Sequence, residues 1–240
     1  MSEPLFRQDP YMREAFARVT ALTDEGGIVL DRTNFYPTGG GQPGDSGRLD
    51  WMGGGIDIAG AVKGRDGAII LLPGEPARLP EPGTEVRQTL AWDRRHRLMR
   101  MHTALHLLSV VIPLPVTGGQ VGSEKGRLDF DMEDSPTAEE ISAIERDLNS
   151  LISCRMEVTD GYITEEELDQ SPELVKTLSV SPPRGQGPIR LVRIGLGSET
   201  ADLQPCGGTH VSNTGEIGRV RIGRIESKGR QNRRVHLHFA

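Results

Sequence analysis

The sequence predicts an α+β protein made of a small N-terminal β-barrel and a C-terminal α+β domain, whose mixed or antiparallel sheet is covered by helices. Before residue 93, short apolar runs alternate with glycine- and proline-rich turns and no helical period occurs, which is typical of a small barrel or sandwich. After residue 93, helical and strand-like segments follow one another without regular alternation. We expect the boundary near 88–93 and two domains, residues 1–90 and 91–240.

The N-terminal part is expected to consist of short strands. Residues 13–33 have the pattern of a hairpin, with alternating apolar residues on both sides of the turn Asp24–Gly27. A glycine-rich loop follows at 34–47, and further apolar runs occupy 56–62, 68–72 and 84–92. The loop is either a flexible turn or a segment whose backbone can approach a ligand closely.

The C-terminal part begins with a predicted helix that has Asp93 as its N-cap and ends before Pro113. Its core-facing residues recur at three- and four-residue spacing: Leu98, Met101, Leu105, Leu108 and Ile112. A second helix starts at the capping box Thr137–Glu140 and ends near Cys154, which is expected to be a small core residue. Strands are predicted at 128–132, 155–163, 189–194, 216–226 and 233–239.

Composition indicates an intracellular globular protein. The chain has 240 residues, a net charge of −6 and two cysteines, so no disulfide framework is expected. No apolar run has membrane-spanning length and the first residues do not resemble a secretory signal. We expect a cytoplasmic protein with no membrane partner; the sequence does not indicate an oligomeric state.

Positive charge is concentrated in two places. From Glu216 onward there are seven cations and two anions, and a second group of arginines at positions 94, 95, 97 and 100 precedes the first histidine pair. Either cluster is a solvated surface or a site for a phosphate backbone.

Two pairs of metal-ligand residues define the expected site. His102 and His106 are four residues apart in the predicted helix, which places both imidazoles on one face. Cys206 and His210 flank two glycines that permit a tight turn. Together they form a nitrogen and sulfur ligand set that zinc prefers. Four protein ligands also close a tetrahedral site, which is more typical of structural than of catalytic zinc.

Taken together, these motifs resemble the editing domain of alanyl-tRNA synthetase. The resemblance rests on Arg100–Leu108, on Cys206–Val211 and on Thr214–Gly218. The glycine-rich loop and the segment Glu226–Arg230 make the chain similar to free-standing AlaX editing proteins of the medium-length type. The stretch 111–117, with two prolines, departs from the family pattern.

The resemblance implies a zinc-dependent deacylase that hydrolyses, in trans, serine or glycine esters of mischarged alanine tRNA. It maps the Zn²⁺ ligands onto His102, His106, Cys206 and His210. Candidate catalytic residues are Thr33, Gln42 and Gln120; Thr33 matches a threonine implicated in choosing serine over alanine, and both glutamines end a Gly-Gly-Gln tripeptide. The candidate tRNA-binding cations are Arg94, Arg100, Lys228, Arg230 and Arg233.

Two other functions remain open from the sequence. One is a tRNA-binding module with a structural zinc and no catalysis, and the other is a metallohydrolase for small esters. Serine or glycine preference, and whether zinc activates water or positions the substrate, are not indicated by the residues.

Overall fold

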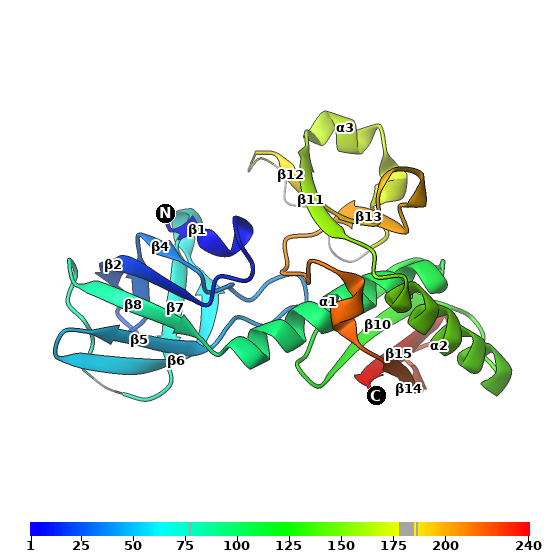
Figure 1. The fold of residues 1–240 in the computed structure, drawn as a ribbon, viewed down its shortest axis with the longest axis horizontal. Helices are drawn as coiled ribbons and strands as arrows, with labels where there is room; N and C mark the ends of the chain where they lie inside the picture. Colours follow the sequence, from blue (N-terminus) through cyan, green and yellow to red (C-terminus); the bar gives the residue numbers. More distant parts are fainter. Residues whose placement is uncertain (77, 178–184, 186) are drawn as a thin grey trace. The chain divides into compact units, whose positions relative to one another are not determined.

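The computed structural model describes residues 1–76, 78–177, 185 and 187–240, and these form two compact units, Met1–Arg97 and Leu98–Ala240. The first contains a closed barrel and the second contains sheets with helices, so the predicted α+β class is confirmed (Figure 1). None of the helices in the described part of the chain has the length and apolarity needed to cross a membrane.

The first unit is a six-stranded antiparallel barrel with the strand order β2-β3-β7-β6-β5-β8. Its strands are β2 (Glu14–Leu22), β3 (Ile28–Leu30), β5 (Gly47–Trp51), β6 (Gly54–Lys63), β7 (Ile69–Pro73) and β8 (Glu85–Leu90). A short parallel pair, β1 (Glu3–Pro4) and β4 (Arg32–Thr33), lies outside the barrel. The predicted hairpin is the pair β2 and β3.

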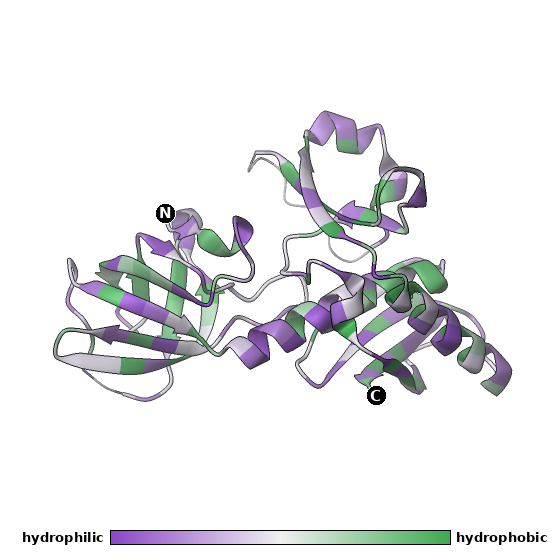
Figure 2. Cartoon of the chain, in the orientation of Figure 1, coloured by the Kyte–Doolittle hydropathy of each residue, from purple (hydrophilic) through white to green (hydrophobic). Residues whose placement is uncertain are grey.

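Period-two alternation builds the barrel core, because successive side chains of a strand point to opposite faces (Figure 2). In β2, Ala17 and Val19 are buried while Arg18 between them is exposed. The core is continued by other strands and by Phe35 of the loop; its fully buried members include Ile28, Leu30, Leu49, Ile58, Leu71 and Val86.

The glycine-rich loop packs against the barrel through its backbone. A Cβ at Gly44 would lie 2.1 Å from the carbonyl oxygen of Ala61, and one at Gly47 would lie 2.2 Å from that of Thr89. Both separations are far below van der Waals contact, so only glycine fits at these two positions. At least part of the glycine content therefore serves packing.

The second unit contains most of the long helix α1 (Trp92–Val111), which begins in the first unit. A four-stranded antiparallel sheet packs on α1, in the order β14 (Val220–Ser227), β15 (Asn232–Phe239), β10 (Lys125–Asp131) and β9 (Val116–Gln120). Gly126 of β10 faces Met101 and Leu105 of α1 so closely that an added Cβ would clash. Helix α2 (Ala138–Ser153) lies against β14.

A smaller antiparallel sheet completes this unit. It consists of β11 (Val158–Ile163), β12 (Ile189–Ile194) and β13 (Asp202–Pro205), with the short helix α3 (Glu165–Asp169) between β11 and β12. Both α2 and α3 begin with a complete capping box, at Thr137 and Thr164.

Three local predictions were wrong. Helix α1 begins at Trp92, because the Arg95 amide already donates to Ala91, so Asp93 lies in the first turn and is not the N-cap. Cys154 is exposed, since it follows the last inward-facing residue of α2, Ile152. The predicted strand 216–226 begins only at Val220, after the 3₁₀ helix η5 (Thr214–Ile217).

Candidate metal centre

His102 and His106 lie one turn apart on α1, as their spacing predicts. Their ring centroids are 5.3 Å apart and both side chains are buried. The neighbouring residues Met101, Leu105 and Leu108 are buried as well, so this stretch of the helix is enclosed on several sides. Rotation of the two imidazoles is therefore restricted by packing.

Cys206 and His210 approach these histidines from the segment that follows β13. Strand β12 holds this segment, because the Arg190 guanidinium donates to the carbonyl oxygens of Cys206 at 2.9 Å and Gly208 at 3.0 Å. The Cys206 amide in turn donates to the Arg190 carbonyl oxygen at 3.1 Å. The ring centroids of His210 and His102 are 4.3 Å apart.

The four side chains fit a zinc ion. One ligand atom from each of His102, His106, Cys206 and His210 lies within 4.8 Å of the others. Cys206 Sγ is 3.5 Å from His102 Nε2 and 3.3 Å from His210 Nε2. In a tetrahedral zinc site with usual bond lengths, sulfur and nitrogen ligands are about 3.6 Å apart. The chemistry and the spacing of the donors both suit this metal.

Further contacts orient two of the imidazoles. His106 Nδ1 is 2.9 Å from Oδ2 of Asp202. The same oxygen accepts from Gln204 at 2.8 Å, and the other carboxylate oxygen, Oδ1, accepts from Lys176 at 2.5 Å. The carboxylate accepts a hydrogen bond from Nδ1–H, so in the neutral imidazole Nε2 keeps its lone pair for a metal.

Thr103 orients His210 in the same way. Its hydroxyl donates to the Met99 carbonyl oxygen at 2.9 Å, so at 3.2 Å from His210 Nδ1 it acts as the acceptor. His210 therefore also carries its proton on Nδ1 and presents Nε2 to the centre.

Electrostatics at the centre favour a bound positive charge. Burial raises the pKa of the Cys206 thiol, but the nearby imidazoles outweigh burial and hold this pKa well below its usual value. Burial lowers the pKa of His106, yet the Cys206 thiolate and Asp202 raise it to about 9. Burial, together with His102, lowers the pKa of His210 to about 3. The Cys206 thiolate and the Asp202 carboxylate thus stabilise a positive charge at His106, and a metal ion that binds here takes the place of that proton.

Comparison with known proteins places the chain in a family. The second additional domain of threonyl and alanyl tRNA synthetases matches residues 189–236, and the class II (A) tRNA synthetase model matches residues 10–94. The alanyl-tRNA editing protein AlaX-M of Methanosarcina acetivorans is 35% identical over 99% of this chain and 98% of its own length. The chain belongs to the AlaX-M family of alanyl-tRNA editing proteins.

Two further relatives are similar to this chain, one over almost its full length and one over part of a longer protein. AlaX-M of Saccharolobus solfataricus is 34% identical over 98% of both chains. The alanine–tRNA ligase of Pyrobaculum arsenaticum is 36% identical over 92% of this chain, but that match covers only 25% of the ligase. The chain is thus similar in length to AlaX-M proteins and to one part of a synthetase.

The predicted catalytic residues have internal partners in this AlaX-M family member. The buried Thr33 hydroxyl donates to Gln88 Oε1 at 2.6 Å and accepts from the Phe35 amide at 3.1 Å. Gln42 is fully buried at a bend of the loop, where its backbone pairs with Gly39. Gln120 is exposed at the end of β9 and accepts from Arg127 at 3.3 Å. The catalytic roles of Thr33, Gln42 and Gln120 stay predictions.

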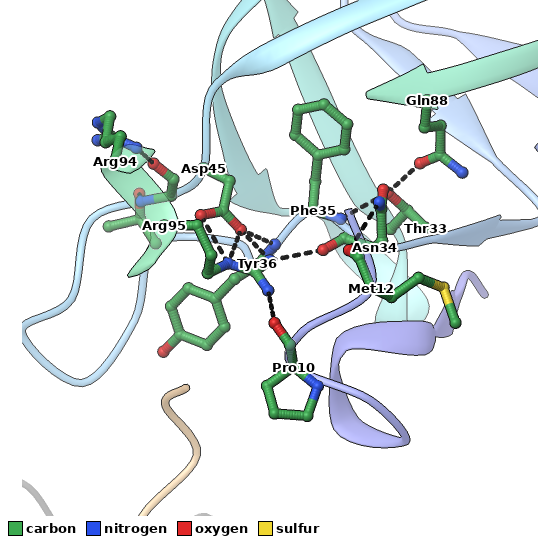
Figure 3. A network of polar contacts seen from close by, with 12 residues as sticks. Pro10, Met12, Thr33, Asn34, Phe35, Tyr36, Asp45, Gln88, Arg94 and Arg95 are labelled. Carbon is green, nitrogen blue, oxygen red and sulfur yellow. Dashed lines mark hydrogen bonds and ion pairs between the residues drawn. The ribbon is translucent and has the colours of Figure 1, made fainter. Parts of the chain in front are cut away.

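A buried ion pair fixes the glycine-rich loop to the first turns of α1 (Figure 3). Arg95 and Asp45 are both at most 1% exposed, and Arg95 Nε lies 2.9 Å from each carboxylate oxygen. Arg95 also donates to the carbonyl oxygens of Pro10 and Asn34, at 2.9 and 2.6 Å. Arg95, which the sequence grouped with surface arginines, is therefore unavailable to a nucleic acid.

The predicted tRNA-binding cations differ in how firmly the protein holds them. Arg100 donates to the Ile217 carbonyl oxygen at 2.6 Å and its guanidinium lies over the Phe239 ring. Arg94 donates to the Gly44 carbonyl oxygen at 2.8 Å. Arg233 donates to the carbonyl oxygens of Glu133 and Gly229, whereas Lys228 pairs with Glu226 at 2.8 Å and Arg230 is exposed.

Sequence reasoning missed the residues that support the ligands. Asp202, Thr103 and Arg190 lie outside the two ligand motifs or between their members, and no spacing rule singles them out. The only signal was indirect. A metal-binding histidine usually donates a hydrogen bond from its second ring nitrogen to a carboxylate, carbonyl or hydroxyl, so such a partner is expected without being identified.

Proposed function

We propose that this protein is a zinc-dependent aminoacyl-tRNA deacylase that removes serine or glycine from mischarged alanine tRNA in trans. The observation that carries the proposal is the buried His102, His106, Cys206 and His210 group in a chain of the AlaX-M family. The relatives' name describes alanyl-tRNA editing, and hydrolysis of the mistaken ester is the chemistry that such editing requires.

Zinc, when bound, would supply a Lewis acid that polarises the ester carbonyl or lowers the pKa of a water. The chain's own residues would hold it in a fixed orientation: Asp202 keeps the proton of His106 on Nδ1, and Thr103 does the same for His210. The aminoacyl ester is intrinsically labile, so correct placement of a water against the carbonyl supplies much of the rate.

The residues proposed for substrate handling are those expected from the sequence. Thr33, Gln42 and Gln120 are proposed to contact the aminoacyl group or the attacking water. Arg94, Arg100, Lys228, Arg230 and Arg233 are proposed to hold the acceptor end; Lys228 and Arg230 are the most exposed of the second-unit cations among them and are the first to test.

A second candidate function is favoured by one observation. The metal centre offers four protein ligands, all within 4.8 Å, which is the arrangement of a closed structural site. The protein would then bind tRNA without hydrolysing it. For catalysis, one ligand must yield its position, the coordination must expand, or the ion must act by holding substrate.

A turnover assay separates these functions. The parent protein is incubated with serine-, glycine- and alanine-charged alanine tRNA and with a free serine ester, and the metal content is measured in the same preparation. A deacylase hydrolyses the mischarged tRNAs, spares alanine-charged tRNA and ignores the free ester. Binding without turnover would support the structural-zinc module, and rapid cleavage of the free ester would support a small-ester hydrolase.

A further inference from the structure

We propose that an open groove beside α2 binds the sugar–phosphate backbone of the substrate tRNA near its acceptor end. The groove has a volume of about 1020 Å³ and runs between α2 and the segment formed by η5 and the start of β14. These elements lie side by side in the second unit (Figure 1). This inference rests on the proposed function and joins one member of the C-terminal cation cluster, Arg219, to two arginines outside it, Arg146 and Arg155.

The groove has the charge that RNA requires. Three arginines line it, Arg146, Arg155 and Arg219, and all three are exposed. Glu145 is the only acidic residue of the lining, and its carboxylate accepts a hydrogen bond from the Ile222 amide at 2.9 Å. In a protein with a net charge of −6, three cations against one engaged carboxylate form a local site for phosphate.

Two of these arginines have no competing carboxylate. Within the described part of the chain, Arg155 and Arg219 form no ion pair, whereas Arg146 lies 3.1 Å from the exposed Asp147. Asn149 makes two hydrogen bonds to the backbone of Val220, which join α2 to the start of β14 next to Arg219. The two sides of the groove are therefore joined, while the Arg155 and Arg219 side chains are available for an external anion.

The conformation of Arg155 supports a role for its side chain. It follows the end of α2 with φ of 52°, a left-handed geometry that normally selects glycine at the end of a helix. The chain holds it there, since Nδ2 of the Asn213 side chain donates to the Arg155 carbonyl oxygen at 2.7 Å. Its side chain lies over Gly215, where an added Cβ would be 2.9 Å from Arg155 Cγ. Glycine would adopt this φ with less conformational strain than arginine does. The presence of arginine at this position therefore points to a function for its cationic side chain.

The groove is close to the metal centre along the chain. Gly215 follows the ligand His210 by five residues, so their Cα atoms are at most about 18 Å apart. Gly218, at the other end of the lining, lies beside the guanidinium of Arg100, two residues before the ligand His102. An RNA backbone held in the groove therefore lies near the site where the terminal ester must react.

The test compares two double variants of equal charge change. Arg155→Gly/Arg219→Ala removes two of the three groove cations and relieves the left-handed geometry, whereas Lys125→Ala/Arg221→Ala removes two exposed cations from one face of the four-stranded sheet. Affinity for alanine tRNA is measured over a range of salt concentrations. The groove variant is expected to reduce the slope of log K against log[salt] by about 1.5 to 2, and the sheet variant to change it much less.

Three readouts make the outcome decisive. Metal content should match the parent in both variants, and the single-turnover rate at saturating tRNA should stay within about twofold of it, because the groove holds the backbone and not the reacting ester. Arg155→Lys/Arg219→Lys should recover most of the salt dependence. An unchanged slope in the groove variant, or an equal loss in the sheet variant, would overturn the proposal.

The reactivity of Cys154 provides an independent test of where the tRNA binds. It is exposed and lines the groove, so bound tRNA should slow its alkylation by iodoacetamide in the parent protein. Alkylation that proceeds at the same rate with saturating tRNA would place the RNA elsewhere. If the parent binds tRNA with protection of Cys154 but does not hydrolyse the mischarged ester, the groove stands and the proposed deacylase function fails.

Discussion

Asp202 contacts the candidate metal centre without belonging to its group of four possible ligands. Its carboxylate contacts His106, Lys176 and Gln204, and these partners come from different parts of the second unit. Burial raises the pKa of Asp202, but His106 and Lys176 outweigh burial and lower it to about 2. A permanently ionised carboxylate at Nδ1 makes the imidazole a better electron donor at Nε2.

Replacing this carboxylate should weaken metal binding without removing a ligand. Asp202→Asn is expected to lower zinc affinity by about 10- to 100-fold, measured by competition with a chromophoric chelator. The matched control is Asp147→Asn, which changes an exposed aspartate of α2. An affinity equal to that of the parent in both variants would show that Asp202 serves the fold and not the metal.

The two cysteines should differ completely in their effect on metal content. Cys206 lies within the ligand group, whereas Cys154 is exposed at the end of α2. Protein purified without added metal should contain near-stoichiometric zinc, Cys206→Ala should lose it and Cys154→Ala should retain it, as measured by elemental analysis. Equal zinc content in the two variants would exclude the proposed ligand set.

Selectivity is expected to depend on Thr33. Its hydroxyl donates a hydrogen bond to Gln88 and accepts one from the Phe35 amide. Only its remaining lone pair can therefore serve a substrate, as an acceptor for the serine hydroxyl. Thr33→Val should lower activity on serine-charged alanine tRNA by about 10- to 100-fold and affect glycine-charged tRNA much less, because glycine has no hydroxyl.

The control for this prediction is Thr20→Val, which removes a hydroxyl bonded to the Val29 carbonyl oxygen on the outside of the barrel. Single-turnover rates on both mischarged substrates provide the measurement. Equal losses on the two substrates would mean that Thr33 shapes the loop through Gln88 and does not recognise the side chain.

At the scale of elements, the loop 33–47 and the helix α1 are joined by the buried pair Asp45 and Arg95. Removing one partner leaves the other charge unpaired in the interior, so Asp45→Ala is expected to cost about 3–5 kcal/mol of stability. Asp50→Ala, which breaks the exposed pair with Arg48, should cost much less, because solvent screens that pair. Denaturant unfolding checks both, and similar small losses would contradict the assigned role of the buried pair.

Local signals predicted most elements, while their ends and partners depended on the rest of the chain. The predicted capping box at Thr137 is observed, because both of its hydrogen bonds lie within four residues of the sequence. Asp93 was misassigned because Ala91, outside the apolar period, accepts the first helical hydrogen bond. Cys154 was expected in the core because free cysteine is usually buried, but it lies at the end of α2, beyond the last buried residue Ile152.

At the scale of the whole molecule, the grouping of His102, His106, Cys206 and His210 could be predicted from the sequence, whereas the residues that contact this group could not. His102 with His106, and Cys206 with His210, are visible as pairs because each pair is local. Asp202 meets His106 across 96 residues, and Asp45 meets Arg95 across 50, so neither contact leaves a periodic trace. The positions of basic residues were also insufficient, because the sequence does not distinguish a buried arginine such as Arg95 from an exposed one.

Metal removal is expected to destabilise the second unit and not the first, because all four ligands lie in Leu98–Ala240 and the barrel has its own core. At free zinc of 100 times Kd, binding contributes about 2.7 kcal/mol, which a chelator removes. Both tryptophans, Trp51 and Trp92, lie in the first unit, so the fluorescence transition should keep its midpoint while amides of β10 and α2 lose hydrogen-exchange protection. Cys206→Ala, expected to lack metal, should not respond to the chelator. A fluorescence midpoint that falls together with this protection would show that the two units unfold as one.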